Sequence, residues 1–112
     1  MQYVDNPGMA VRAAAAIPQY ALVKYDGTLC GANTTPDIIG VAMESRDSGK
    51  LIPIRFLSAG TVPAIAAEPI TVGDLVYKAA SGKVNKTNTN LLVGRAMEAA
   101  TADGDFIQIQ PL

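Results

Sequence analysis

The segment IGVAMES at residues 39–45 recurs as VGRAMEA at residues 93–99, so the two copies stand at a constant offset of 54 residues. The glycine, alanine, methionine and glutamate are identical in both copies. Each copy precedes a turn that contains glycine and then an apolar run. Two copies at so long a period do not make a solenoid. The repeat predicts one β domain built from two similar halves, at about residues 20–57 and 73–110.

Short apolar runs between turn residues indicate the class of the fold. The last run alternates between isoleucine and glutamine, which is typical of a half-buried strand. Glycine, proline, asparagine and aspartate separate the runs and mark turns. We expect strands at residues 21–25, 51–56, 75–78 and 106–110. The sequence therefore predicts an all-β chain, folded as a small β-barrel or a β-clip-like domain.

The first residues form a segment of their own. We expect an N-terminal arm at residues 1–17, followed by a single β domain at residues 18–112. A short alanine-rich helix is the alternative for the arm, since alanine has the best helix propensity. Pro7 and Pro18 bracket the segment, and so short an isolated helix is marginal, which favours an extended arm. Deleting residues 1–16 is then expected to leave a folded domain.

The composition limits the possible partners. Hydrophobic residues make up 49% of the 112 residues and charged residues 17%, which excludes a disordered tail. The net charge of −1 provides no basic excess for nucleic acid. The longest apolar run is too short for a bilayer, and the N-terminus lacks the regions of a signal peptide. We expect a protein made in a cytoplasm, without nucleic-acid or membrane partners, whose surface is partly covered by assembly.

Few residues could carry chemistry. The chain has no histidine and one cysteine, which excludes the usual general base, an intrachain disulfide and a cysteine zinc site. Glu44 and Glu98, at equivalent repeat positions, could form the carboxylate pair of a hydrolase. Two solvated charges at strand ends are the favoured interpretation. Asp103 and Asp105 fit a turn better than a calcium loop. We expect no enzyme, no cofactor and no metal site.

Two strand glycines and the one cysteine need an explanation. Gly40 and Gly94 lie inside strand patterns, which indicates a bulge or a close approach of two backbones, with a ligand cradle as the alternative. Cys30 has no imidazole in the chain to activate it. We expect a buried apolar thiol at this position.

Two stretches, residues 11–17 and 59–70, are more apolar than a free surface needs. Apolar arms and edges are typical of chains that pack on a neighbour, and the prolines of the second stretch favour an edge strand or a loop. The alternative is that both stretches fold back over the core. The expected contacts with a partner or another subunit are Val11, Arg12, Ile17, Val62 and Ile65.

Four motifs follow in order along the second half: PITVGDLVY at residues 69–77, GKV at 82–84, LVGRA at 92–96 and GDFIQI at 104–109. Their order and spacing resemble the small capsid decoration, or cement, proteins of tailed bacteriophages. The resemblance covers residues 68–110 well, is weaker over residues 17–57 and does not extend to residues 1–16.

The resemblance implies a fold related to β-clips or barrels, with no catalytic residues. It implies homotrimers at threefold or quasi-threefold positions on the outer capsid surface, where each copy staples neighbouring major capsid proteins and the N-terminal arm contacts the shell. It also implies synthesis in the cytoplasm of a bacterial host. The alternatives are a small ligand- or carbohydrate-binding β module, which the scarcity of aromatic residues disfavours, and another virion component such as a fibre or tail part.

Overall fold

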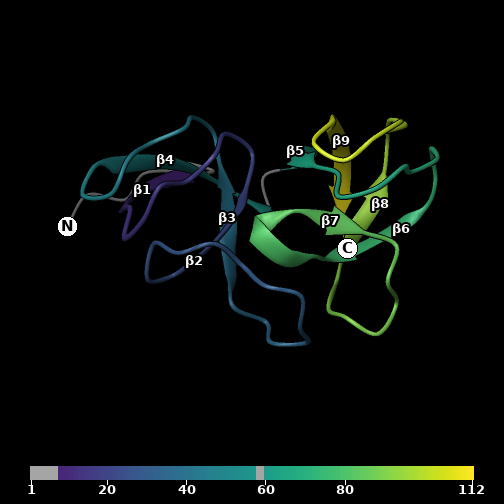
Figure 1. Ribbon diagram of the computed structural model, residues 1–112, viewed down its shortest axis with the longest axis horizontal. Coiled ribbons are helices and arrows are strands. Elements are labelled where there is room, and N and C mark those ends of the chain that lie inside the picture. Colours follow the sequence, from purple (N-terminus) through teal and green to yellow (C-terminus); the bar gives the residue numbers. More distant parts are fainter. Residues whose placement is uncertain (1–7, 58–59) are drawn as a thin grey trace.

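Two antiparallel sheets make up the molecule, the first on the left of Figure 1 and the second on the right. The computed structural model describes residues 8–57 and 60–112. Within these ranges there is no α-helix, and a short 3-10 turn lies at Ala80–Gly82. The strands are β1 (Gly8–Arg12), β2 (Leu22–Lys24), β3 (Ile38–Ala42), β4 (Leu51–Phe56), β5 (Val62–Ile65), β6 (Leu75–Lys78), β7 (Val84–Asn85), β8 (Leu92–Ala96) and β9 (Phe106–Pro111). The all-β prediction is confirmed.

The first sheet has the strand order β1-β4-β3-β2 and curls toward closure. Just after β1, the backbone N–H of Ala14 donates to the carbonyl of Gly27, in the turn that follows β2, at 3.1 Å. Gly27 has a φ of +83°, and a side chain there would run into the carbonyl oxygen of Arg12. Glycine is the residue that tolerates both conditions. The contact brings the two edges of the sheet together as a half-barrel.

The second sheet has the order β5-β9-β8-β6-β7 and closes in a similar way. The residue after β5, Ala66, forms a parallel bridge with Val84 of β7. The N–H of Ala67 donates to the carbonyl of Val84 at 2.8 Å. Closure of this kind satisfies backbone groups that an open edge would leave to solvent.

Equivalent strand pairings occur within each of the two sheets. Val23 lies opposite Gly40 and Val76 lies opposite Gly94, and the register shifts directly after each valine. β3 pairs next with β4, and β8 pairs next with β9. These parallels support the two-half duplication, which stays a prediction.

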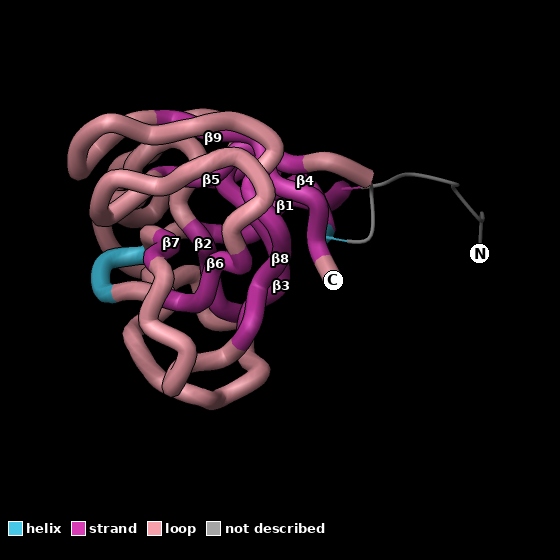
Figure 2. Tube along the Cα trace, turned by 90° about the vertical axis from the view of Figure 1, so that its right-hand side faces the viewer, coloured by secondary structure: helices cyan, strands magenta, loops and turns pink. Residues whose placement is uncertain are grey.

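The core is shared between the two halves. Leu22, Cys30 and Val41 belong to the first sheet or its loops, yet they pack in the cluster that fills the second sheet. In return, Ile65 of β5 packs in the cluster that fills the first sheet. Figure 2 shows the strands of both sheets gathered at the centre with the long loops around them. Each half therefore depends on the other for part of its packing.

The described part of the expected arm is packed into the first sheet. β1 pairs with β4 over its whole length, from Gly8 opposite Arg55 to Arg12 opposite Leu51. Ala13 is 2% exposed and Ile17 is 1% exposed. The extended conformation was expected, and the helix alternative is wrong for the described residues. Residues 1–7 of the expected arm lie outside the described residues, and a domain boundary after residue 17 stays a prediction.

Candidate interaction surface

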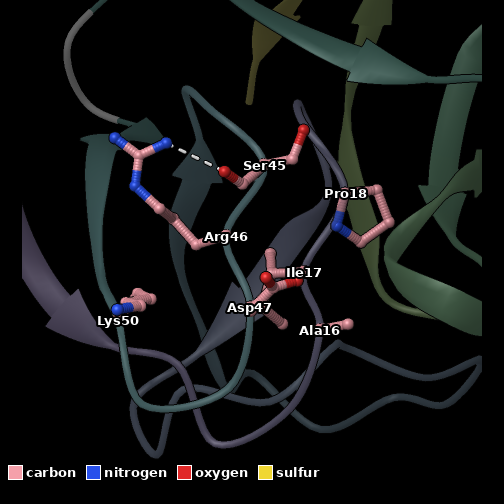
Figure 3. A pocket seen from close by; sticks show the side chains of 7 residues that line it. All are labelled: Ala16, Ile17, Pro18, Ser45, Arg46, Asp47 and Lys50. Atoms are coloured by element: carbon pink, nitrogen blue, oxygen red, sulfur yellow. Dashed lines mark hydrogen bonds between the residues drawn. The ribbon is translucent and has the colours of Figure 1, made fainter.

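A shallow pocket opens at the first sheet, where the segment after β1 meets the loop between β3 and β4 (Figure 3). Its volume is about 510 Å³. Two backbone hydrogen bonds hold its walls together, from Ile17 N to Arg46 O at 2.9 Å and from Arg46 N to Ile17 O at 3.0 Å. The residues that line it are Ala16, Ile17, Pro18, Ser45, Arg46, Asp47 and Lys50.

Charged side chains of both signs surround this pocket. Arg46 donates from Nη1 to the carbonyl of Ser45 at 2.8 Å and from Nη2 to Oε1 of Glu44 at 3.0 Å. Arg12 donates from Nη1 to the carbonyl of Gly49 at 2.6 Å. Such exposed pairs contribute little stability, about 0–1 kcal/mol each, and leave the charges available to a partner. The hydrogen bonds of Arg46 and Arg12 hold their guanidinium groups in place at the surface.

Exposed apolar groups complete the surface. Ala14, Ala15 and Ala16 are exposed, and Leu51 is 53% exposed. We call residues 12–18 together with residues 44–51 the contact face. It combines a hollow, apolar side chains, three cationic groups and the two carboxylates Glu44 and Asp47, a mixture that suits a protein–protein contact.

The five residues predicted for contact differ in how far they are exposed. Arg12 is exposed and lies on the contact face, and Val11 beside it is half-buried. Ile17 contributes backbone to the pocket, but its side chain is buried. Val62 is 0% exposed and Ile65 is 5% exposed, because β5 lies between the two cores. Ile17, Val62 and Ile65 thus fold back over the chain's own core, whereas Ala14, Ala15 and Ala16 of the first stretch stay exposed.

Sequence analysis missed a polar site at the junction of the two halves. Lys78 of β6 is 0% exposed, and its Nζ donates to Asn33 Oδ1 at 2.7 Å, to Thr35 O at 2.7 Å and to Asp37 Oδ1 at 2.6 Å. A lysine ammonium has three donors, so all are used. Strand alternation could have revealed the site, because it places Lys78 on the same face as the buried Val76.

The carboxylates singled out from the sequence have separate structural partners. Glu44 binds Arg46, whereas Glu98 Oε1 accepts from the backbone N–H of Gln108 at 2.8 Å. Asp105 accepts from the backbone N–H groups of Thr101 and Ala102, which lie in the turn before β9. These hydrogen bonds hold the pKa of the Asp105 carboxyl below its usual value. The side chains act as caps of turns and strand ends.

The repeated glycines lie where two backbones approach closely. A side chain at Gly40 would run into the carbonyl oxygen of Arg55, and one at Gly94 would run into that of Gln110. The close approach predicted for both positions is confirmed. Cys30 is buried and free, and burial raises the pKa of its thiol to about 12. The prediction of a buried apolar thiol is therefore confirmed.

In residues 8–57 and 60–112, no group of three or more cysteine or acidic side chains is placed to hold a metal ion. Over the same ranges no helix has the length and apolarity to cross a membrane. A second hollow, of about 320 Å³, lies beside the end of β9 and is lined by Leu57, Gly60, Thr61, Gln110 and Pro111.

The all-β architecture and a surface suited to protein contacts define a structural protein, and comparison with known proteins specifies its class. The family model for phage cement proteins matches residues 5–111. The chain therefore belongs to the phage cement protein family and is a structural virion protein of a bacteriophage. The resemblance seen in the sequence motifs is confirmed.

A solved structure has the same fold. The chain is similar to the N base of head fibre gp8.5 in bacteriophage phi29, with a TM-score of 0.76 and 24% sequence identity. The match covers 94% of this chain and 92% of the phi29 chain. A search of curated proteins found no match. Membership of the cement family implies association with the virion and its capsid.

Proposed function

We propose that this protein binds the outer surface of the capsid and stabilises contacts between major capsid proteins through its contact face. The observation that carries the proposal is the pocket between residues 16–18 and 45–50, with Arg46 and Lys50 on one side and Pro18 on the other (Figure 3). Family membership supplies the partner. The pocket suits an apolar side chain of a shell protein, and the cations around it suit acidic groups beside that side chain.

Binding of this kind requires no turnover. A standard interface buries about 800 Å² per partner, and one small domain can present such a patch. We propose a homotrimer at threefold or quasi-threefold positions, since linked copies multiply modest contacts into tight attachment. We also propose that the protein is not an enzyme. Its candidate carboxylates, Glu44 and Glu98, are bound to separate partners.

Co-sedimentation tests capsid binding directly. Purified protein is mixed with expanded, undecorated shells of the phage that encodes it, and the shells are pelleted. We expect saturable binding, with a number of copies set by the lattice. If the protein stays in the supernatant with competent shells, the capsid-binding proposal fails.

Paired variants test the face. Ala16→Asp introduces a carboxylate into the pocket, and Lys50→Glu reverses a charge at its rim. Both are expected to weaken shell binding about tenfold or more, because a desolvated carboxylate costs about 1–3 kcal/mol or more. The matched controls Ala99→Asp and Lys86→Glu change exposed residues of the second half. If the controls weaken binding and the face variants do not, the contact lies on the second half instead.

A head-fibre base is the second candidate, because the fold matches that of the phi29 head fibre N base. Counting the copies per virion by quantitative mass spectrometry separates the two roles. Copies in proportion to every threefold or quasi-threefold position support a cement. A smaller number confined to a subset of positions supports a fibre base.

A further inference from the structure

The buried lysine at the junction of the halves has two possible reaction partners within hydrogen-bond distance. Lys78 Nζ lies 2.7 Å from the side-chain oxygen of Asn33 and 2.6 Å from a carboxylate oxygen of Asp37. From this geometry we propose that Lys78 and Asn33 form an intramolecular isopeptide bond, with Asp37 as the proton-transfer group. The product is an amide that links the loop before β3 to strand β6.

The position of Lys78 keeps its amino group out of solvent. Its side chain is 0% exposed, and a buried ammonium loses its hydration. The Asp37 carboxylate, 24% exposed, can accept a proton from Nζ across their short hydrogen bond. Cys30 lies near both groups, and burial raises the pKa of its thiol to about 12, which indicates surroundings of low polarity. A desolvated lysine amine is an effective nucleophile toward carbonyl carbon.

The amide of Asn33 is held ready for attack. Its Oδ1 accepts a second hydrogen bond, from the backbone N–H of Thr35 at 3.0 Å. This donor polarises the carbonyl and stabilises the negative charge that Oδ1 acquires when the amine adds. Thr35 also orients the amine, because its carbonyl oxygen accepts from Nζ at 2.7 Å. Holding both reactants in one site replaces a bimolecular encounter with an intramolecular step.

The proposed reaction balances without a further reagent. Asp37 takes a proton from the Lys78 ammonium, and the Nζ lone pair forms a bond to Cγ of Asn33. The tetrahedral intermediate then breaks its bond from Cγ to Nδ2. Asp37 returns its proton to Nδ2, and ammonia leaves from Cγ. This ammonia takes one proton from Nζ and is released as ammonium, which leaves the neutral amide. Asn33 is an exposed residue, so the ammonia has a path to solvent.

The linkage joins parts of the chain that are far apart in sequence. Asn33 belongs to the loop between β2 and β3 of the first sheet, and Lys78 belongs to β6 of the second sheet. A covalent bond here restricts the unfolded chain, as a disulfide does. The chain has only one cysteine and cannot form an intrachain disulfide.

The mass of the purified full chain, measured after denaturation, tests the proposal. We expect a loss of one ammonia, about 17 Da, relative to the sequence. Trypsin should then yield one joined product of residues 25–46 and 56–83, uncleaved at Lys78. An unaltered mass, with cleavage after Lys78, overturns the proposal and leaves an ionic contact only. A loss of ammonia without the joined product, as from cyclisation of an N-terminal glutamine, also overturns it.

Variants identify the groups involved. Lys78→Arg retains a cation but cannot form this amide, and Asp37→Asn removes the proton acceptor, so both should have the unaltered mass of their sequences. Lys83→Arg is the matched control, because Lys83 also binds a carboxylate, Asp103 at 2.7 Å, but at the surface. The control should retain the loss of ammonia. Because the reaction requires the folded site, circular dichroism must show that each variant folds as the parent chain does before its mass is compared.

Discussion

Gly94 of β8 lies so close to Gln110 of β9 that any side chain at position 94 would run into the carbonyl oxygen of Gln110. Gly40 stands in the same relation to Arg55 in the first sheet. The obstructing atoms are backbone in both sheets, so they cannot swing aside as a flexible side chain would. The motif that repeats along the sequence therefore marks a close approach of two neighbouring strands in each half.

Gly40→Ala and Gly94→Ala should each destabilise the fold. Accommodating the new methyl group requires two paired strands to separate, and overpacking of this kind costs about 1–3 kcal/mol. Urea unfolding, followed by circular dichroism, measures the loss. Gly31→Ala is the control, because its new Cβ would meet only the Asn33 side chain, at an ordinary 3.5 Å. Equal stability of the three variants would contradict the close-approach explanation.

Replacing Lys78 with methionine should destabilise the protein more than replacing an exposed lysine. Lys78→Met removes the buried donor to Asp37 and to the carbonyl of Thr35, and it also removes the proposed link to Asn33; breaking a buried pair alone costs about 3–5 kcal/mol. Lys83→Met removes an exposed pair with Asp103 and should cost less than about 1 kcal/mol. Thermal unfolding of both variants beside the parent chain gives the comparison. Similar losses of stability in the two variants would show that Lys78 contributes no more to the fold than an exposed lysine does.

The fold was more predictable from the sequence than the sites. Strands at residues 51–56 and 75–78 were predicted at their observed bounds, because apolar runs between glycine turns are local signals. Val62 and Ile65 were expected at a surface because an apolar stretch looks the same whether it meets a partner or the chain's own second half. Lys78 was missed because its acceptors lie more than 40 residues away in sequence, and only the fold brings them together.

Truncation separates the two interpretations of the N-terminal segment. The arm interpretation expects little change in the midpoint of thermal unfolding when residues 1–7 are removed. Removing residues 1–13 deletes β1 and Ala13, and uncovers the edge of β4 beside the buried Ile52 and Ile54. We expect a loss of several kcal/mol, since each large apolar side chain newly exposed costs about 1.5–3 kcal/mol.

Differential scanning calorimetry of the two truncations provides the measurement. The arm interpretation instead expects a folded domain after deletion of residues 1–16. A cooperative transition at the parent temperature in the 1–13 truncation would favour that arm and contradict a structural role for β1. Co-sedimentation of the 1–7 truncation with shells then shows whether these first residues contribute to binding.

The Cys30 thiol should be unreactive in the folded protein. Burial raises the pKa of this thiol from 9.0 to about 12, so at pH 8 the folded chain contains almost no thiolate, which is the reactive form. A thiol whose pKa is higher in the folded state stabilises the fold below the unfolded pKa. That contribution is lost as the pH rises from 9.0 toward about 12.

Iodoacetamide labelling at pH 8, followed by mass spectrometry, should modify the urea-unfolded chain within minutes and the native chain only at the rate of unfolding. Between pH 9 and 11 the stability of Cys30→Ala should fall less steeply than that of the parent. Rapid labelling of the native protein, or parallel pH profiles for the two chains, would show that the thiol is accessible and that its burial does not govern its ionisation.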